Sequence, residues 1–197
     1  MKVLKTERAR KNHRKIFDVA IELFEKNGFD AVKMGDIAIV ANVARSSVFN
    51  HFPSKMDVLA EFFEQFTLGI VEEAQQTRQL GFHAKMDALF LAAGTAATPR
   101  RRVLQEVASQ VVGHGPLAAV DSEADRHLMS YITEQVTMAQ STQEVRADIE
   151  VELLANIVLA IMTATLHDWV SGSVDRTLDT ELRKRFEVIL HGATPKH

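Results

Sequence analysis

The stretch that decides the fold is residues 33–52, which read KMGDIAIVANVARSSVFNHF. Asparagine tolerates the positive φ of a tight turn better than most residues do, so Asn42 marks a turn. Apolar residues repeat at helical spacing on both sides of it: Ile37, Ala38 and Ala41 before, and Val43, Val48, Phe49 and Phe52 after. The pattern predicts two short helices joined by a tight turn, which is a helix-turn-helix motif.

The second of these helices carries polar side chains suited to reading DNA. Arginine can pair with guanine O6 and N7, and asparagine with adenine N6 and N7, so Arg45 and Asn50 are candidates for direct contact with bases. In the alternative interpretation Val48, Phe49 and Phe52 are only core, and Arg45 and His51 are only solvated surface.

Helical periodicity extends in both directions from the motif, and no stretch alternates as a strand would. Upstream, one helix face runs from Ile16 to Phe24, and Gly28 ends that helix. Downstream, Ser54 and Asp57 form an N-cap pair for a long fourth helix. Further helices are predicted at about 84–96, from Thr98-Pro99 onward, and at about 122–140, 148–170 and 178–190. We therefore predict an all-α fold, with a three-helix N-terminal helix-turn-helix domain (residues 1–53) and a six-helix C-terminal domain (residues 54–197).

Composition excludes several other classes of protein. With 46% hydrophobic and 25% charged residues among 197, the chain can bury a core and is not a disordered segment. The absence of cysteine excludes a disulfide scaffold and a thiolate zinc site. Metal-ligand spacings, a nucleophile elbow and a phosphate-binding loop are also absent, so we expect no metal, no cofactor and no enzyme activity. The longest apolar run, residues 153–166, is shorter than the roughly 20 residues of a membrane span, which predicts a buried helix and no membrane partner.

Charge is distributed unevenly along the chain. Residues 1–55 hold eleven Lys and Arg against six Asp and Glu, whereas residues 56–197 hold twelve against twenty. A basic N-terminal quarter indicates a surface that faces a polyanion. A second basic cluster, residues 100–102, predicts either a solvated or salt-bridged face or a contact with the N-terminal domain.

Together these residues resemble the TetR/AcrR family of bacterial transcriptional regulators. The resemblance covers about residues 14–59 and rests on Ala20-x-x-Leu23-Phe24-x-x-x-Gly28, Ile37-Ala38-x-x-Ala41-x-Val43 and Val48-Phe49-x-His51-Phe52-x-x-Lys55-x-x-Leu59. It implies a cytoplasmic homodimer that binds a palindromic double-stranded DNA operator and is a repressor released by a small apolar effector. The DNA-binding residues are then expected to be Arg14, Lys33, Arg45, Ser46, Ser47, Phe49, Asn50, His51 and Lys55.

The sequence departs from the family pattern mainly at helix starts. Lys33 stands where the family usually has Thr, and Ala44 where it usually has Ser. Losing such an N-cap typically costs about 0.5–2 kcal/mol. Asn42, Ser46-Ser47 and Phe49 replace the usual Gly, Gly-Thr and Tyr. The departures support an alternative function, that of a helical scaffold or interaction protein whose N-terminal domain no longer reads DNA.

The resemblance also implies an effector pocket in the C-terminal domain. Its mostly apolar wall is expected to contain Phe62, Phe66, Met86, Phe90, His127, Tyr131 and Trp169. Plain core packing of the same residues is the alternative.

The helix predicted at residues 148–170 is apolar nearly all round and therefore needs a cover on its second face. The final helix has a matching apolar stripe. We predict a four-helix dimer interface built from Ile157, Ile161, Leu178, Leu182, Phe186 and Ile189. The alternative is that residues 148–170 form the central helix of a monomer.

Overall fold

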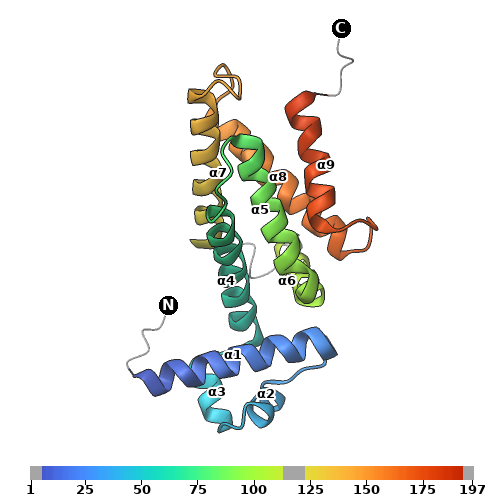
Figure 1. Cartoon of the computed structure of the whole chain (residues 1–197). Coiled ribbons are helices and arrows are strands. Elements are labelled where there is room, and N and C mark those ends of the chain that lie inside the picture. The colour runs from blue at the N-terminus through green and yellow to red at the C-terminus, as the bar shows by residue number, and fades with distance from the viewer. Residues whose placement is uncertain (1–5, 113–122, 193–197) are drawn as a thin grey trace. The chain divides into compact units, whose positions relative to one another are not determined.

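The computed structural model describes residues 6–112 and 123–192, which form helices and no strand, so the all-α prediction is confirmed (Figure 1). Most helix positions agree with the sequence pattern. The bounds are α1 (Glu7–Asn27), α2 (Met34–Val40), α3 (Arg45–His51), α4 (Lys55–Gln75), α5 (Phe82–Ala97), the 3₁₀ turn η1 (Thr98–Arg100), α6 (Arg101–Val112), α7 (Glu123–Ser141), α8 (Val151–Val170) and α9 (Leu178–His191).

Local sequence rules account for several of the helix ends. Gly28 adopts φ 87° and its N–H donates to the Phe24 carbonyl at 2.9 Å, which ends α1 as predicted. Asp57 accepts hydrogen bonds from the backbone N–H and the hydroxyl of Ser54, at 2.8 and 2.6 Å, so the predicted cap pair of α4 is confirmed. The helix predicted from Thr98 begins instead at Arg101: Thr98 is the C-cap of α5, with its hydroxyl donating to the Gly94 carbonyl at 2.8 Å, and the 3₁₀ turn η1 lies between the two helices.

The described residues divide into two compact units. The first contains residues 6–63 and 100–112, and the second contains residues 64–99 and 123–192. Helix α4 therefore starts in the first unit and ends in the second. The sequence instead placed a boundary after residue 53 and assigned α6 to the C-terminal domain.

Helix α6 belongs to the first unit because it is tied to the end of α1. Both carboxylate oxygens of Glu25 accept from the backbone N–H of Arg102, at 3.2 and 3.1 Å, and one also accepts from that of Val103, at 3.0 Å. In return, the Arg102 guanidinium donates to the Lys26 carbonyl at 2.9 Å. Glu25 thus caps the start of α6 while Arg102 caps the end of α1. For Arg102, the predicted contact with the N-terminal domain is confirmed.

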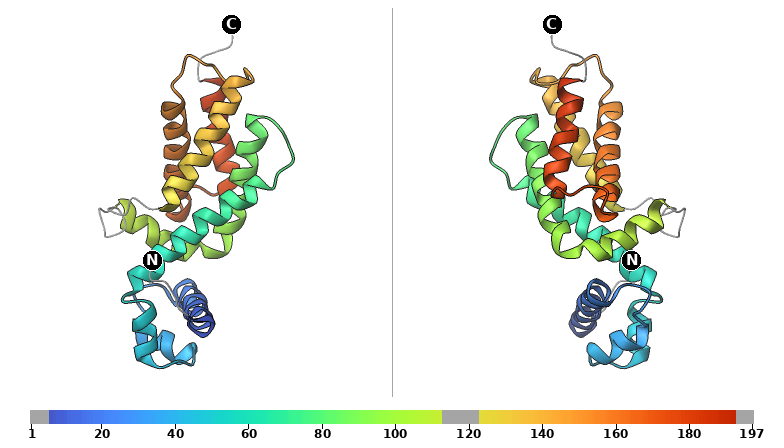
Figure 2. Two further views of the ribbon diagram at one scale, coloured as in Figure 1. Left: turned by 90° about the vertical axis from the view of Figure 1, so that its left-hand side faces the viewer. Right: turned by 90° about the vertical axis from the view of Figure 1, so that its right-hand side faces the viewer.

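The second unit is a bundle in which α5 and α8 each pack against both α7 and α9 (Figure 2). The ring of Phe186 in α9 lies 5.7 Å from that of Phe82 and 5.3 Å from that of Phe90, both in α5. Leu178, Leu182 and Phe186 are at most 2% exposed within the single chain. Within the single chain the apolar stripe of α9 is covered by α5 and its neighbours, and the place of these three residues in a dimer interface stays a prediction.

The start of α5 is capped by a residue distant in sequence. The Glu144 carboxylate accepts from the Phe82 backbone N–H at 2.7 Å and from the Thr142 hydroxyl at 2.8 Å. The hydrogen bond from Phe82, and then that from Thr142, lowers the pKa of Glu144 below its ordinary value of 4.5. The carboxylate therefore stays charged where it complements the positive end of the α5 dipole.

Helix α8 is longer than the apolar run that the sequence shows. It has 20 residues, and an 18-residue window reaches a mean hydropathy of 1.5. By length and composition alone it could cross a membrane, so the shortness of the apolar run is not sufficient to exclude a span. One such helix is weak evidence for a membrane span, because the core helix of a soluble protein passes the same test. In this fold 39% of the window is buried.

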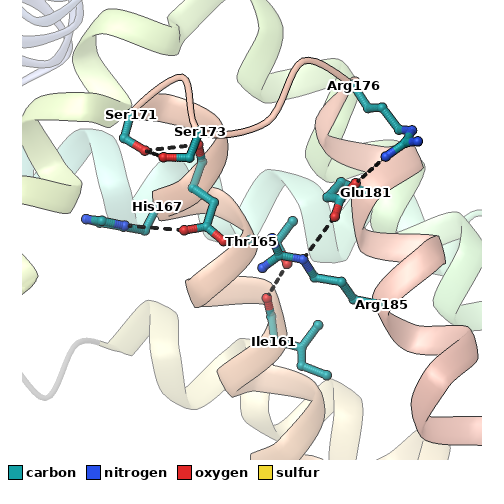
Figure 3. A network of polar contacts seen from close by, with 9 residues as sticks. Ile161, Thr165, His167, Ser171, Ser173, Arg176, Glu181 and Arg185 are labelled. Atoms are coloured by element: carbon teal, nitrogen blue, oxygen red, sulfur yellow. Dashed lines mark hydrogen bonds and ion pairs between the residues drawn. The ribbon is translucent and has the colours of Figure 1, made fainter. Parts of the chain in front are cut away.

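A group of charged side chains links α8 to α9 (Figure 3). The Arg185 guanidinium lies 2.6 Å from the Asp168 carboxylate and 3.2 Å from that of Glu181, which also accepts from Arg176 at 3.4 Å. Burial raises the pKa of Glu181, but the hydrogen bond from Arg185 and the charges of Lys184 and Arg185 outweigh burial and lower it below 4.5. Arg185 therefore holds two carboxylates, of which Glu181 is almost completely buried.

We predict that Arg185→Ala lowers the free energy of unfolding by about 1–3 kcal/mol, because the buried carboxylate of Glu181 loses the nearer of its two arginine donors and keeps only Arg176. The loss should be largest at neutral pH. It should shrink as the pH falls below 4.5, since a lowered folded-state pKa contributes stability only while the group is ionised. Urea denaturation at a series of pH values measures both effects.

The matched control is Arg146→Ala, which removes an exposed ion pair with Asp148. Exposed pairs contribute little, so the stability of this variant should be unchanged. Equal losses in the two variants would contradict the role given to Arg185.

Candidate nucleic-acid interface

The turn between α2 and α3 has the geometry that the sequence predicts. Asn42 adopts φ 50°, the left-handed conformation that asparagine tolerates. The N–H of Val43 donates to the Ala38 carbonyl at 3.1 Å and closes the turn. The two short helices therefore form the predicted helix-turn-helix motif.

The start of α2 has a cap that sequence reasoning missed. The Asp36 carboxylate accepts from the backbone N–H of Lys33 at 2.8 Å, which is the half of a capping box that the third residue of the helix supplies. The carboxylate also places a negative charge in the first turn, where it compensates the exposed Lys33. Ala44 supplies no side-chain hydrogen bond to the start of α3, so that predicted loss of a cap is confirmed.

Helix α3 has one buried face and one exposed face. Val48 is completely buried, and Phe52 just after the helix is 2% exposed. On the other side Arg45, Ser46 and Asn50 are exposed, and Ser47 and His51 are half-buried. The ring of Phe49 is 41% exposed and was wrongly assigned to core in the alternative interpretation. The motif thus presents most of the predicted DNA-binding residues on one short helix.

The end of α3 is held by a ring cluster that the sequence did not indicate. The His13 ring of α1 stacks on Phe52 at 4.5 Å and meets the His51 ring edge-on at 5.4 Å. His13 Nε2 lies 2.9 Å from both carboxylate oxygens of Glu61 in α4. These contacts fix the last turn of α3 against α1 and α4. Because His13 and Glu61 lie far apart along the chain, no sequence pattern reveals their pairing.

The predicted basic contacts differ in their surroundings. Lys33 and Arg14 are exposed, and Arg14 pairs with Asp18 one helical turn away at 3.0 Å. The Lys55 ammonium donates to the Phe29 carbonyl at 2.6 Å and lies 4.2 Å from the Phe29 ring centroid. Lys55 therefore has a role inside the first unit, and its contact with DNA stays a prediction.

The predicted effector-pocket residues divide by burial. Phe62 belongs to the first unit and the other six to the second. Those that are buried are Phe62, Met86, Phe90, Tyr131 and Trp169. Phe66 is half-buried, and His127 is exposed and therefore does not lie on an enclosed wall.

Two open hollows lie on the described surface of the second unit. One, of about 920 Å³, lies along α7 between Arg126 and Ser141, with Leu159 of α8 on its edge. The other, of about 720 Å³, lies between α4 and α5 and includes Glu73 and Leu91. None of the seven predicted pocket residues lines either hollow. Within the described residues, no cluster of three or more His, Asp and Glu side chains could hold a metal ion.

Comparison with known proteins places this motif in a family. Residues 16–62 match the family described as bacterial regulatory proteins, tetR family. A curated relative, the HTH-type transcriptional regulator AcrR of Shigella flexneri, is 24% identical over 193 residues, which cover 93% of this chain and 90% of the relative. These matches support a TetR/AcrR family transcriptional regulator. The helix-turn-helix motif of α2 and α3 is its DNA-binding part.

Two solved structures of transcriptional regulators share the fold over most of the chain. Thermus thermophilus FadR, a TetR family repressor in complex with lauroyl-CoA, has a TM-score of 0.71 and 22% identity, and covers 94% of this chain and 96% of its own. Bacillus subtilis FadR in complex with stearoyl-CoA has a TM-score of 0.71 and 16% identity, covering 92% and 100%. At these identities the similarity establishes the fold alone.

Proposed function

We propose that this regulator is a cytoplasmic homodimer that represses transcription by binding a palindromic operator through α3 and leaves it when a small apolar effector binds. The observation that carries the proposal is the exposed row of Arg45, Ser46 and Asn50 opposite the fully buried Val48. A rigid recognition helix with polar side chains on its outer face is what major-groove reading requires.

Charge supports DNA as the partner of this face. Eleven Lys and Arg against six Asp and Glu give residues 1–55 an excess of five positive charges. Lys33 is exposed next to α2, and Arg45 is exposed in the first turn of α3. We assign Arg45 and Asn50 to bases, and Arg14, Lys33, Ser46, Ser47, His51 and Lys55 to the phosphate backbone or to neighbouring base edges. The Asp36 cap weakens the case for a scaffold with a degenerate DNA-binding domain, because the start of α2 is stabilised without Thr.

We predict that the protein binds a duplex carrying the DNA upstream of its own coding sequence, and that the affinity falls steeply with salt. Each neutralised phosphate contributes a slope of about 0.9 in log affinity against log salt. Lys33→Ala should reduce the slope by about one, whereas Arg45→Ala should cost about 1–3 kcal/mol on the operator and relax sequence preference at one position. Fluorescence anisotropy between low and moderate salt, on the operator and on duplexes with single base-pair changes, measures the salt dependence, the slope of Lys33→Ala, and the affinity and sequence preference of Arg45→Ala.

Leu80→Ala is the control, since Leu80 is exposed in the second unit, outside the DNA-binding residues. Its affinity and slope should equal those of the wild type. Affinity that does not depend on salt, or equal binding of operator and random duplex by wild type, would favour the scaffold alternative.

The second copy is proposed to cover the outer face of α8. Leu153 and Ile157 are 52% and 38% exposed, and Val188 of α9 is 56% exposed. Ile161 and Ile189 are half-buried and can contribute. In the proposed interface, these exposed and half-buried residues take the place of Leu178, Leu182 and Phe186, which are buried within the single chain. Less than half of the apolar stretch of α8 is buried within the chain. A second copy that covers the exposed part would account for this apolar face, and no membrane is then needed.

We predict that the protein is a dimer at micromolar concentration and that Ile157→Asp or Val188→Asp shifts it to monomer. A charge in an apolar interface of about 1,600 Å² has no compensating partner. Sedimentation velocity measures the change. Leu80→Asp, at a side chain that is 89% exposed, should leave the dimer intact. A wild-type monomer, or wild type that sediments with phospholipid vesicles, would overturn the assignment.

The effector is proposed to be an apolar acyl compound, because two of the structural relatives are complexes with acyl-CoA ligands. In this chain Tyr131 of α7 is 4% exposed, and its hydroxyl has no hydrogen-bond partner among the described residues. Burial, and then the charge of Glu134, raises the pKa of Tyr131 above 10.0, so the hydroxyl keeps its proton and can donate to a ligand. An effector that prefers one conformation of the protein then shifts the dimer away from the DNA-binding state.

We predict that lauroyl-CoA releases the protein from the upstream duplex and that coenzyme A without an acyl chain does not. The apolar chain supplies the binding free energy when it leaves water. Anisotropy of the labelled duplex measures release. Release by coenzyme A alone, or a complex that saturating lauroyl-CoA leaves intact, would contradict an acyl effector.

A further inference from the structure

An exposed aromatic ring stands among the polar side chains of α3. Phe49 is 41% exposed, while Ser46 and Asn50 beside it are polar. Where the family pattern has Tyr, Phe49 offers no hydroxyl that could bond a phosphate. The ring can therefore contribute to DNA binding only through apolar contact or through its π face.

Arg45 lies one helical turn before Phe49 and uses that π face. Its guanidinium carbon is 5.7 Å from the Phe49 ring centroid, within the range of a cation–π interaction. Residues at positions i and i+4 share one side of a helix, so the guanidinium and the ring reach the same stretch of groove. Successive bases are about 3.4 Å apart along a strand. A guanidinium and a ring at this separation therefore face bases one or two steps from each other.

We propose that Phe49 reads a thymine through its C5-methyl group, and that Arg45 reads a guanine one or two base pairs away. In the major groove thymine presents an apolar methyl group beside its O4 acceptor, whereas guanine, adenine and cytosine present hydrogen-bonding groups and no methyl group. A phenyl ring placed over those polar edges would desolvate them without compensation. The inference rests on the proposed DNA-binding function and makes Phe49 a specificity-determining residue.

Removing the methyl group from the DNA tests this contact without changing any base pair. Full-length protein is used to enrich duplexes from a random pool, and the enriched sequence is resynthesised with deoxyuridine in place of thymine at one position at a time. For wild type, one thymine in each half-site, within two base pairs of an invariant guanine, should bind about fourfold more weakly as deoxyuridine, which is the effect of one buried methyl group. Phe49→Ala should bind the two duplexes equally, and Phe49→Leu should show an intermediate ratio.

Ile39→Ala is the matched control, because Ile39 is an apolar residue of α2 that is 78% exposed. It should keep the wild-type ratio, and thermal unfolding of each variant verifies folding. Wild type that is indifferent to deoxyuridine at every position overturns the inference while leaving DNA binding intact. A fourfold ratio that persists in Phe49→Ala also overturns it. Failure to enrich any sequence would instead contradict the proposed function.

Discussion

The outer face of α3 depends on the burial of its inner face. An isolated helix of seven residues is not stable in water, since nucleation costs more than so few hydrogen bonds return. Val48 and Phe52 supply the missing stabilisation by packing into the core of the first unit, and the His13 ring holds the last turn. Those contacts set the direction of the polar side chains of α3 that are proposed to contact DNA. The recognition surface is therefore a product of tertiary packing rather than of helix propensity.

Much of this arrangement could be predicted because its causes are local. Helical periodicity locates the helices, and each of the stop at Gly28, the left-handed turn at Asn42 and the Ser54–Asp57 cap involves residues within a few positions of one another. Short-range steric and hydrogen-bonding rules can be applied to a single sequence. The family pattern in residues 14–59 is itself a set of such local requirements, which is why it identifies the DNA-binding part with few residues.

The errors have one physical origin, which is that a sequence shows that a side chain is apolar or charged but not what covers it. The stripe of Leu182 and Phe186 is covered by α5 of the same chain, so its apolar character does not by itself require a partner copy. Glu144 caps a helix whose first residue is far earlier in the chain, and Lys55 donates to a carbonyl rather than pointing freely outward. The placement of the effector-pocket residues and of the dimer face depends on the same long-range information.

In the contact between α1 and α6, the donor and acceptor roles of the two side chains are fixed as well as their charges. Glu25 accepts from two backbone N–H groups, while Arg102 donates to a carbonyl. Exchanging the two residues would still leave one positive and one negative side chain at this contact, with their positions reversed. Yet an arginine at position 25 has no acceptor for the free N–H groups of α6, and a glutamate at position 102 has no donor for the carbonyl of Lys26. The pair is therefore not interchangeable, and a relative carrying the reversed charges at these two positions would have to join α1 to α6 by different atoms.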